Sequence, residues 1–183
     1  MIAMQNSAGH AMKRRIAWLA ALMCCALLAG CSEELDWREL HSQAGGFALM
    51  LPSKPARIDH AAQIGGASVQ LHMLSSQLDG MAFGAAYAER PVNIPAERLV
   101  SESRDALLRN INGRIETESK IEVGGARGIE FHATGQAGAE PMRLAARLLV
   151  DQDRLYQVVF IGRTARAAEV DLRFYLDSFR LLR

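Results

Sequence analysis

Cysteine is absent from the chain after residue 31, and the only cysteines are Cys24, Cys25 and Cys31. A domain built from the residues that follow can therefore hold no internal disulfide and no zinc site of the cysteine type. Four histidines follow Cys31, and no two of them have a local metal-binding spacing such as His-x-x-x-His. These absences exclude the commonest disulfide scaffolds and zinc motifs.

Signatures of catalysis and of nucleic-acid binding are also missing. No cluster of lysine and arginine of the kind that binds nucleic acid occurs after Cys31. The residues around Ser68 lack the second glycine of a nucleophile elbow, and residues 124–128 are too few for a phosphate loop. Glu116 and Glu118 share a strand face with Arg114 and Lys120 on either side of them, which is typical of a solvated strand face. We therefore expect no enzyme, no cofactor and no nucleic-acid partner.

The N-terminus, by contrast, has the three parts of an export signal. Residues 13–15 are basic, residues 16–28 carry no charge, and the small residues Ala29 and Gly30 stand directly before Cys31. The uncharged run is shorter than the ~20 residues of a membrane-spanning helix. The pattern predicts a cleaved signal peptide over residues 1–30. Because Met12 directly precedes the basic residues, residues 1–11 are a candidate start-site extension.

Leu28-Ala29-Gly30-Cys31 resembles the lipobox of bacterial lipoproteins. The resemblance implies cleavage between Gly30 and Cys31, a diacylglyceryl group on the Cys31 thiol and an acylated amine. Ser32, rather than Asp, follows the cysteine, and by the same resemblance this implies an outer-membrane anchor facing the periplasm. Two or three acyl chains anchor stably, because each buried CH2 contributes about 0.8 kcal/mol. The alternative is an uncleaved anchor helix with a chance cysteine.

Cleavage would leave 153 of the 183 residues, which is the size of one domain. The mature chain would carry 18 basic and 20 acidic residues, a net charge near −2. Residues 31–46 are mostly polar and predict a tether, although Trp37 and Leu40 lie within it. Residues 47–183 predict a single domain.

Alternating apolar and polar residues predict a series of strands in that domain. They cover residues 47–51, 67–75, 81–88, 114–123, 127–135, 142–150 and 154–161, with a weaker strand over 58–62. Residues 154–161 are apolar on both faces apart from Gln157, which is typical of a sheet centre. The charged face of residues 114–123 favours a sheet edge.

Two helices complete the pattern. Apolar residues at 3–4 spacing between Pro95 and Gly113 predict an amphipathic helix, and a second is expected from a Thr164 cap to Phe179. Tight turns between the strands make the sheet antiparallel. A sheet that is apolar on both faces needs a covering layer on each side. The predicted fold is therefore α+β, with an antiparallel sheet sandwiched between helices.

This order of elements is similar to that of the Mog1/PsbP-like superfamily, which includes lipoproteins of the DcrB type. The residues that carry the likeness are Phe47-Ala48-Leu49-Met50-Leu51-Pro52, the segment 125–131, Arg154-Leu155-Tyr156-Gln157-Val158 and Leu176-Asp177-Ser178-Phe179. The resemblance covers Phe47 to Leu182. It implies a partner-binding module that is mostly non-catalytic, with no catalytic residues to transfer.

Two groups of residues suggest where binding could occur. Arg143 and Arg147 share a strand face with small residues, so they are candidates to hold a carboxylate or a partner; alternatively, they pair with acids of a covering helix. His72 and His132 are interpreted as ordinary surface or half-buried histidines. A remote alternative is that the two hold a metal ion together with Glu130. Our first hypothesis is a non-enzymatic lipoprotein that binds an envelope protein or assists envelope assembly.

The second hypothesis is a carrier of a small ligand or lipid. It rests on the nearly flat face of Ala82, Gly84, Ala86 and Ala88, which would let another element or molecule approach the strand closely. A hydrolase with an unrecognised site is the remote alternative.

Overall fold

The computed structural model describes residues 35–182. The expected signal peptide, the lipobox, the cleavage site at Gly30 and the lipidation site Cys31 lie outside the described residues. Between residues 35 and 182 the structure contains no helix with the length and apolar character needed to cross a membrane.

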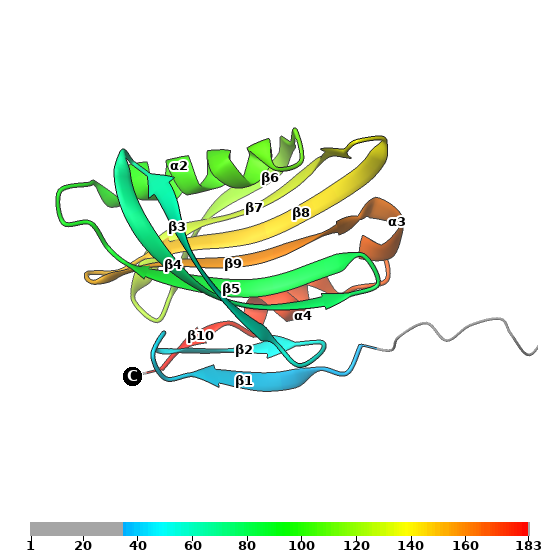
Figure 1. The fold of residues 1–183 in the computed structure, drawn as a ribbon, viewed down its shortest axis with the longest axis horizontal. Coiled ribbons are helices and arrows are strands. Elements are labelled where there is room, and N and C mark those ends of the chain that lie inside the picture. The colour runs from blue at the N-terminus through cyan, green and yellow to red at the C-terminus, as the bar shows by residue number, and fades with distance from the viewer. Residues whose placement is uncertain (1–34, 183) are drawn as a thin grey trace, which may run out of the picture. The chain divides into compact units, whose positions relative to one another are not determined.

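A seven-stranded antiparallel sheet forms the body of the domain, in the order β3-β4-β5-β9-β8-β7-β6 (Figure 1). Its strands are β3 (Ala56–Ile64), β4 (Ala67–Leu78), β5 (Met81–Glu89), β6 (Arg114–Val123), β7 (Ala126–Ala137), β8 (Glu140–Val150) and β9 (Arg154–Arg163). Every neighbouring pair runs antiparallel, as the tight turns predict. The antiparallel α+β character expected from the sequence is confirmed.

The positions of β9 and β6 follow from their side chains. β9 lies in the middle of the seven strands, and it buries Tyr156, Val158 and Phe160 on one face and Leu155 on the other. β6 is an edge strand with mostly exposed residues. A bulge between Ile115 and Thr117 shifts its register against β7, so the strict alternation expected along residues 114–123 breaks at that point.

Helix α2 (Ala96–Arg109) covers one face of the sheet. It buries Leu99, Val100 and Ser103, and the apolar side of this layer also contains Phe131 and Leu148 from the sheet. The helix and its amphipathic face agree with the prediction from the sequence.

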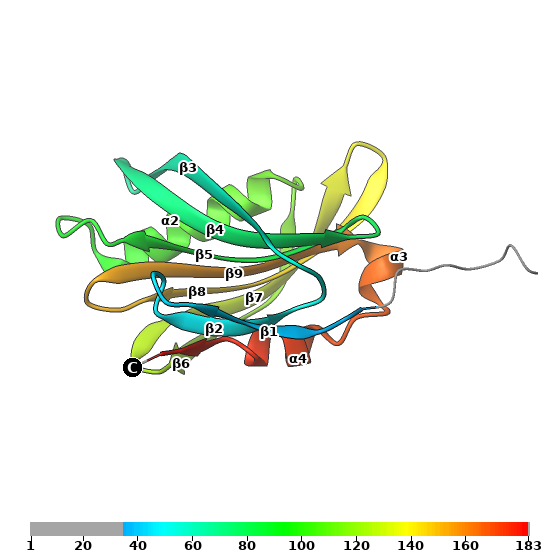
Figure 2. The same cartoon turned by 60° about the horizontal axis from the view of Figure 1, so that its bottom comes forward.

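The opposite face is covered by a second sheet as well as by a helix. β1 (Arg38–Ser42), β2 (Phe47–Leu51) and β10 (Arg180–Leu181) form a three-stranded sheet beside helix α4 (Leu172–Asp177), as Figure 2 shows. β2 contributes Phe47, Leu49 and Leu51 to the core on this side. The sequence predicted a helix as the covering layer on this side. The six residues of α4 are too few to cover the face, and the three-stranded sheet covers the rest of it.

The tether expected over residues 31–46 is shorter than predicted. Residues 38–42 form β1 and pair with β2, from Arg38 opposite Leu51 to Ser42 opposite Phe47. Just before β1, Trp37 packs against Phe83, at 5.6 Å between ring centroids. The partners of this segment are distant in the sequence, so its own composition indicated only a polar linker.

The single last helix expected from Thr164 to Phe179 is also wrong. The chain forms a short helix α3 (Thr164–Ala167), then turns, and begins α4 anew. The cap of α4 is Asp171, whose side chain accepts a hydrogen bond from the Phe174 N–H at 2.9 Å. Thr164 makes no cap, because it lies inside α3.

Candidate functional site

The best candidate site is an open groove on the α2 side of the main sheet. Its volume is about 230 Å³, which exceeds the roughly 150 Å³ of an engineered apolar cavity that binds benzene. Strands β3, β4, β5, β8 and β9 and the C-terminal end of α2 line it. The lining residues are His60, Leu71, Met73, Ser75, Ala82, Phe83, Gly84, Ala86, Leu107, Asn110, Leu144, Gln157, Val159 and Ile161.

Small residues of β5 make part of the floor. Ala82, Gly84 and Ala86 belong to the flat face predicted from the sequence, and all three line the groove. A methyl group on Gly84 would lie 3.1 Å from the Leu74 carbonyl oxygen of the neighbouring strand, so larger residues there would crowd both strand and groove. The space above β5 thus depends on the absence of long side chains.

The wall opposite this floor was not foreseen. Leu107 of α2 lines the groove from the helix layer, whereas Met73 of β4 lies beside the floor, in register with Ala86 of β5. The period of each element predicts which of its faces is apolar. It carries no information about which two apolar faces leave a space between them.

The polar groups of the groove are few, and one is already engaged. The Gln157 side chain is only 9% exposed, and its Nε2 donates a hydrogen bond to Ser103 Oγ of α2 at 3.3 Å. This bond explains how β9 accommodates a polar side chain at its centre, because burying an amide without a hydrogen-bond partner costs free energy. Gln157 therefore holds α2 above the sheet at one side of the groove.

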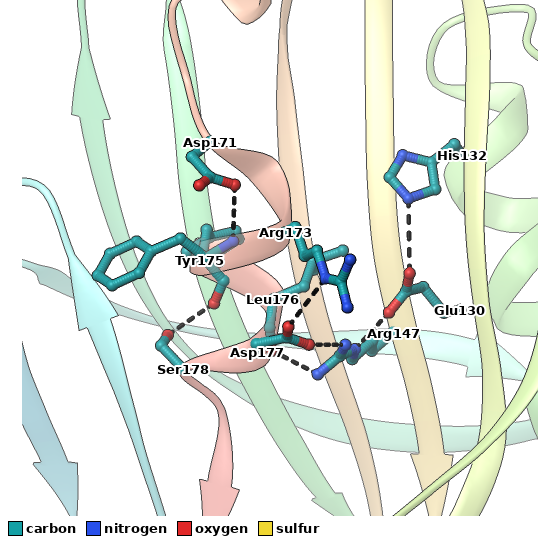
Figure 3. Close-up of polar contacts among 10 residues, drawn as sticks. Glu130, His132, Arg147, Asp171, Arg173, Tyr175, Leu176, Asp177 and Ser178 are labelled. Atoms are coloured by element: carbon teal, nitrogen blue, oxygen red, sulfur yellow. Dashed lines mark hydrogen bonds and ion pairs between the residues drawn. The ribbon is translucent and has the colours of Figure 1, made fainter.

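Arg147 of β8 lies on the other face, where it is the centre of a polar cluster (Figure 3). Its Nε donates to Glu130 Oε2 of β7 at 2.6 Å, and its Nη1 donates to the Leu176 carbonyl oxygen at 2.7 Å. Its Nη2 pairs with Asp177 at the end of α4. The side chain is 12% exposed. Of the two interpretations, the structure supports pairing with acids of a covering helix, and it leaves this guanidinium engaged within the domain.

The same cluster shifts the titration of Asp177. The hydrogen bond from Arg147 lowers the pKa of the Asp177 carboxyl, with a smaller contribution from Arg173, whose Nε lies 3.5 Å from Asp177 Oδ2. A cation near the last turn also interacts favourably with the helix dipole. Arg147 thus fastens the end of α4 to the sheet.

Arg143 does not join this cluster. It lies four residues along β8, about 13 Å away at the usual rise of a strand, and is paired in register with Thr134 and Gly162. Its Nε is buried without a hydrogen-bond partner among residues 35–182. The two arginines therefore do not form one carboxylate-binding site.

The two histidines proposed as a remote metal site are far apart. His72 lies on β4 and His132 on β7, with β5, β9 and β8 between them; this separation is about 19 Å at the usual strand spacing. His72 instead pairs with Asp59 at 3.0 Å, and His132 lies 3.6 Å from Glu130. Within the described part of the chain, no group of three metal-ligating side chains occurs.

Ser68, Glu116 and Glu118, the residues weighed for catalysis, lie on two separate strands, β4 and β6. Ser68 and His72 are four positions apart on β4, so their backbones are about 13 Å apart, too far for a nucleophile and its base. Glu118 pairs with Arg104 of α2 at 3.1 Å. Glu116 lies at the bulge between Ile115 and Thr117 and has no partner in the register with β7. This arrangement favours the interpretation of these carboxylates as surface groups.

Comparison with known proteins identifies the fold. No family model and no curated protein matches the sequence. Among solved structures, the chain is similar to the cyanobacterial PsbP protein (CyanoP) of Synechocystis sp. PCC 6803, with a TM-score of 0.52 and 12% sequence identity. The match covers 84% of this chain and 96% of that chain. The fold is therefore PsbP-like, as the resemblance of the sequence implied.

Proposed function

We propose that the mature chain is a non-enzymatic, lipid-anchored protein of the cell envelope that binds a small apolar ligand. Cys31 carries the anchor in this proposal, and the domain faces the periplasm from the outer membrane. The observation that carries the binding role is the groove of about 230 Å³ above the small residues of β5. The anchor rests on the lipobox and signal pattern of residues 13–31.

The lining of the groove indicates the class of ligand. Leucine, methionine, alanine, valine and isoleucine side chains make most of its surface, and an apolar pocket with few polar groups selects a ligand by shape and hydrophobicity. The Gln157 amide is occupied by Ser103, so it is not free to recognise a charged group. A short acyl chain fits this description better than a sugar or a nucleotide.

Binding of octanoate tests the proposal. The mature chain with Cys31→Ala would be purified without detergent, examined by native mass spectrometry for a co-purifying ligand, and titrated with octanoate. Ala82→Phe fills the groove from its floor, so we expect it to weaken binding at least tenfold. Ala61→Phe is the matched control, because Ala61 is an exposed alanine of β3 that does not line the groove. Absence of both a bound ligand and octanoate binding would contradict the proposal.

Binding of an envelope protein is a second candidate, favoured by the exposure of β3. β3 is an edge strand with β4 on one side, and seven of its nine residues, Ala56 to Ala61 and Gln63, are exposed. Open edges of this kind pair with extended segments of other chains. Crosslinking in cells from position 61, with Cys31→Ala as the comparison, would capture one dominant envelope protein from the anchored form only.

A further inference from the structure

Phe174 is an exposed aromatic residue on a helix whose other apolar side chains are buried. Its side chain is 44% exposed, whereas Leu172, Tyr175 and Leu176 of α4 are at most 8% exposed. Its ring packs edge-on against Trp37, at 5.3 Å between centroids. An exposed phenylalanine beside a tryptophan is a feature that the groove and the fold do not explain.

Trp37 joins this surface to the core. It stacks on Tyr175 at 6.2 Å and meets Phe83 at 5.6 Å, while part of it remains exposed. Its neighbour Leu35 also packs against the core. The position of the Trp37–Phe174 pair is thus fixed by the domain, and the chain is anchored to the core from residue 35 onward.

The position of this pair in the chain places it close to the expected lipid anchor. Leu35 is four positions after Cys31 in the sequence, and Trp37 is six positions after it. A fully extended chain of these lengths spans at most about 14 Å and about 20 Å. If Cys31 is acylated, as the proposed function requires, these short spans hold the start of the domain close to the lipid headgroups.

We propose that the Trp37–Phe174 surface is a membrane-contact surface that rests on the lipid headgroups and inserts the Phe174 ring. Tryptophan suits this position, because its ring is apolar and its N–H is polar, and aromatic residues gather at the membrane interface. The inference rests on the lipid anchor of the proposed function and is independent of the groove ligand.

The charges around the pair favour apolar contact over electrostatic attraction. The Arg173 side chain is 91% exposed, but Asp177 lies 3.5 Å from it, and the exposed Arg38 pairs with Asp36. Asp171 adds a further carboxylate at the start of α4. Because basic and acidic groups offset one another, binding needs no anionic lipid and changes little with salt.

Fluorescence of Trp37 tests the surface directly. The sequence has two tryptophans, Trp18 and Trp37, and removal of residues 1–30 leaves Trp37 alone. The mature lipoprotein would be reconstituted in phosphatidylcholine vesicles with and without lipids brominated near the headgroup end of the acyl chains. We expect the bromines to reduce Trp37 emission at least twofold, equally in 0.05 M and 0.5 M salt.

Two variants distinguish lipid contact by the Trp37–Phe174 surface from mere closeness of the domain to the bilayer. Phe174→Ser should lower the quenching ratio by at least half, whereas Val92→Ser, at an 88% exposed apolar residue elsewhere, should leave it unchanged. Taking the ratio for each variant removes any change in Trp37 emission caused by loss of its neighbour. Ten Gly/Ser residues inserted after Ser32 should preserve the quenching, because the surface has its own affinity for lipid.

The outcomes distinguish this inference from the proposed function. A protein that fails to float with the vesicles overturns the anchor and this inference together. Flotation without quenching, or equal quenching in Phe174→Ser and the parent protein, overturns the membrane surface alone. Loss of quenching on lengthening the tether does the same. Octanoate binding by the groove is measured separately and is unaffected by any of these results.

Discussion

The hydroxyl of Tyr175 on α4 accepts a hydrogen bond from the backbone N–H of Gly84 on β5, at 2.9 Å. The same oxygen lies 2.9 Å from the Gly84 carbonyl and 3.1 Å from the Val159 carbonyl of β9, to one of which it donates. The side chain is fully buried, and burial raises the pKa of the Tyr175 phenol above its usual range. It therefore keeps its proton and links the helix to two strands beneath the groove.

Tyr175→Phe should destabilise the domain by about 1–3 kcal/mol, because it leaves the buried Gly84 N–H without a partner. Chemical denaturation followed by circular dichroism measures the change. Tyr87→Phe is the control: the Tyr87 hydroxyl makes no hydrogen bond within residues 35–182, so we expect a change below about 0.5 kcal/mol. Equal stability of the two variants would show that the Tyr175 hydroxyl contributes nothing.

The sequence predicted Tyr175 as one member of an apolar helix face but could not predict its hydrogen bonds. Gly84 is 91 residues away along the chain, and no local pattern joins the two. Most strands of the main sheet were predictable because they carry their own alternation of apolar and polar residues, and β9 was predictable as a short apolar run. The β8–β9 hairpin and the central place of β9 were predictable from a tight turn and the apolar character of β9, whereas the pairing of β9 with β5 was not.

β1 could not be predicted, because its own residues carry only a weak strand pattern. Its burial increases only toward Ser42, and its first two residues, Arg38 and Glu39, are exposed. Pairing with β2 and the packing of Trp37 hold it in place, so tertiary contacts outweigh a weak local preference. At the candidate site the sequence likewise indicated the small residues of β5, but not the α2 wall above them.

Arg147→Lys should destabilise the domain, although it keeps the charge. An ammonium group cannot reproduce the fork that binds Glu130, the Leu176 carbonyl and Asp177 together. Because the site is largely buried, we expect a loss of about 1–3 kcal/mol in the free energy of unfolding. Arg173→Lys, at an exposed side chain, is the control and should change it by less than about 0.5 kcal/mol. A tolerated Arg147→Lys would indicate that charge alone fastens α4.

The contribution of Asp177 should depend on pH. Arg147 lowers the pKa of this carboxyl in the folded protein, so its contribution is present above the unfolded pKa of about 3.9 and is lost as pH falls through the lower folded value. Asp177 is half exposed, which limits the effect to about 1 kcal/mol or less.

Unfolding of Asp177→Asn and the parent protein between pH 7 and pH 2.5 measures this contribution. The difference should be constant from pH 7 to about pH 5 and should shrink below about pH 4, where the carboxylate becomes protonated. Asp153→Asn is the control, because Asp153 is exposed and forms no ion pair in the described segment. A difference that grows with falling pH would have the wrong sign for this assignment.

Ser103 and Gln157 should show strong coupling in a double-mutant cycle. Ser103→Ala leaves the Gln157 amide buried without its partner, so we expect a loss of about 1–3 kcal/mol. Adding Gln157→Met replaces the remaining polar group by an apolar one of similar length and should recover much of that loss. Additive effects of the two substitutions would show that a water or another group already satisfies Gln157.

Trp37→Ala distinguishes a structural role of the segment before β1 from a mere tether. A fully buried aromatic residue contributes about 3–5 kcal/mol relative to alanine, and Trp37 is only partly buried, so we expect a loss of about 2 kcal/mol. The loss arises from contacts with Phe83, Phe174 and Tyr175. Val92→Ala, at an 88% exposed residue, should change the stability by less than about 0.5 kcal/mol. If residues 31–46 acted only as a spacer, the two substitutions would be indistinguishable in denaturation, and β1 would make no contribution to the fold.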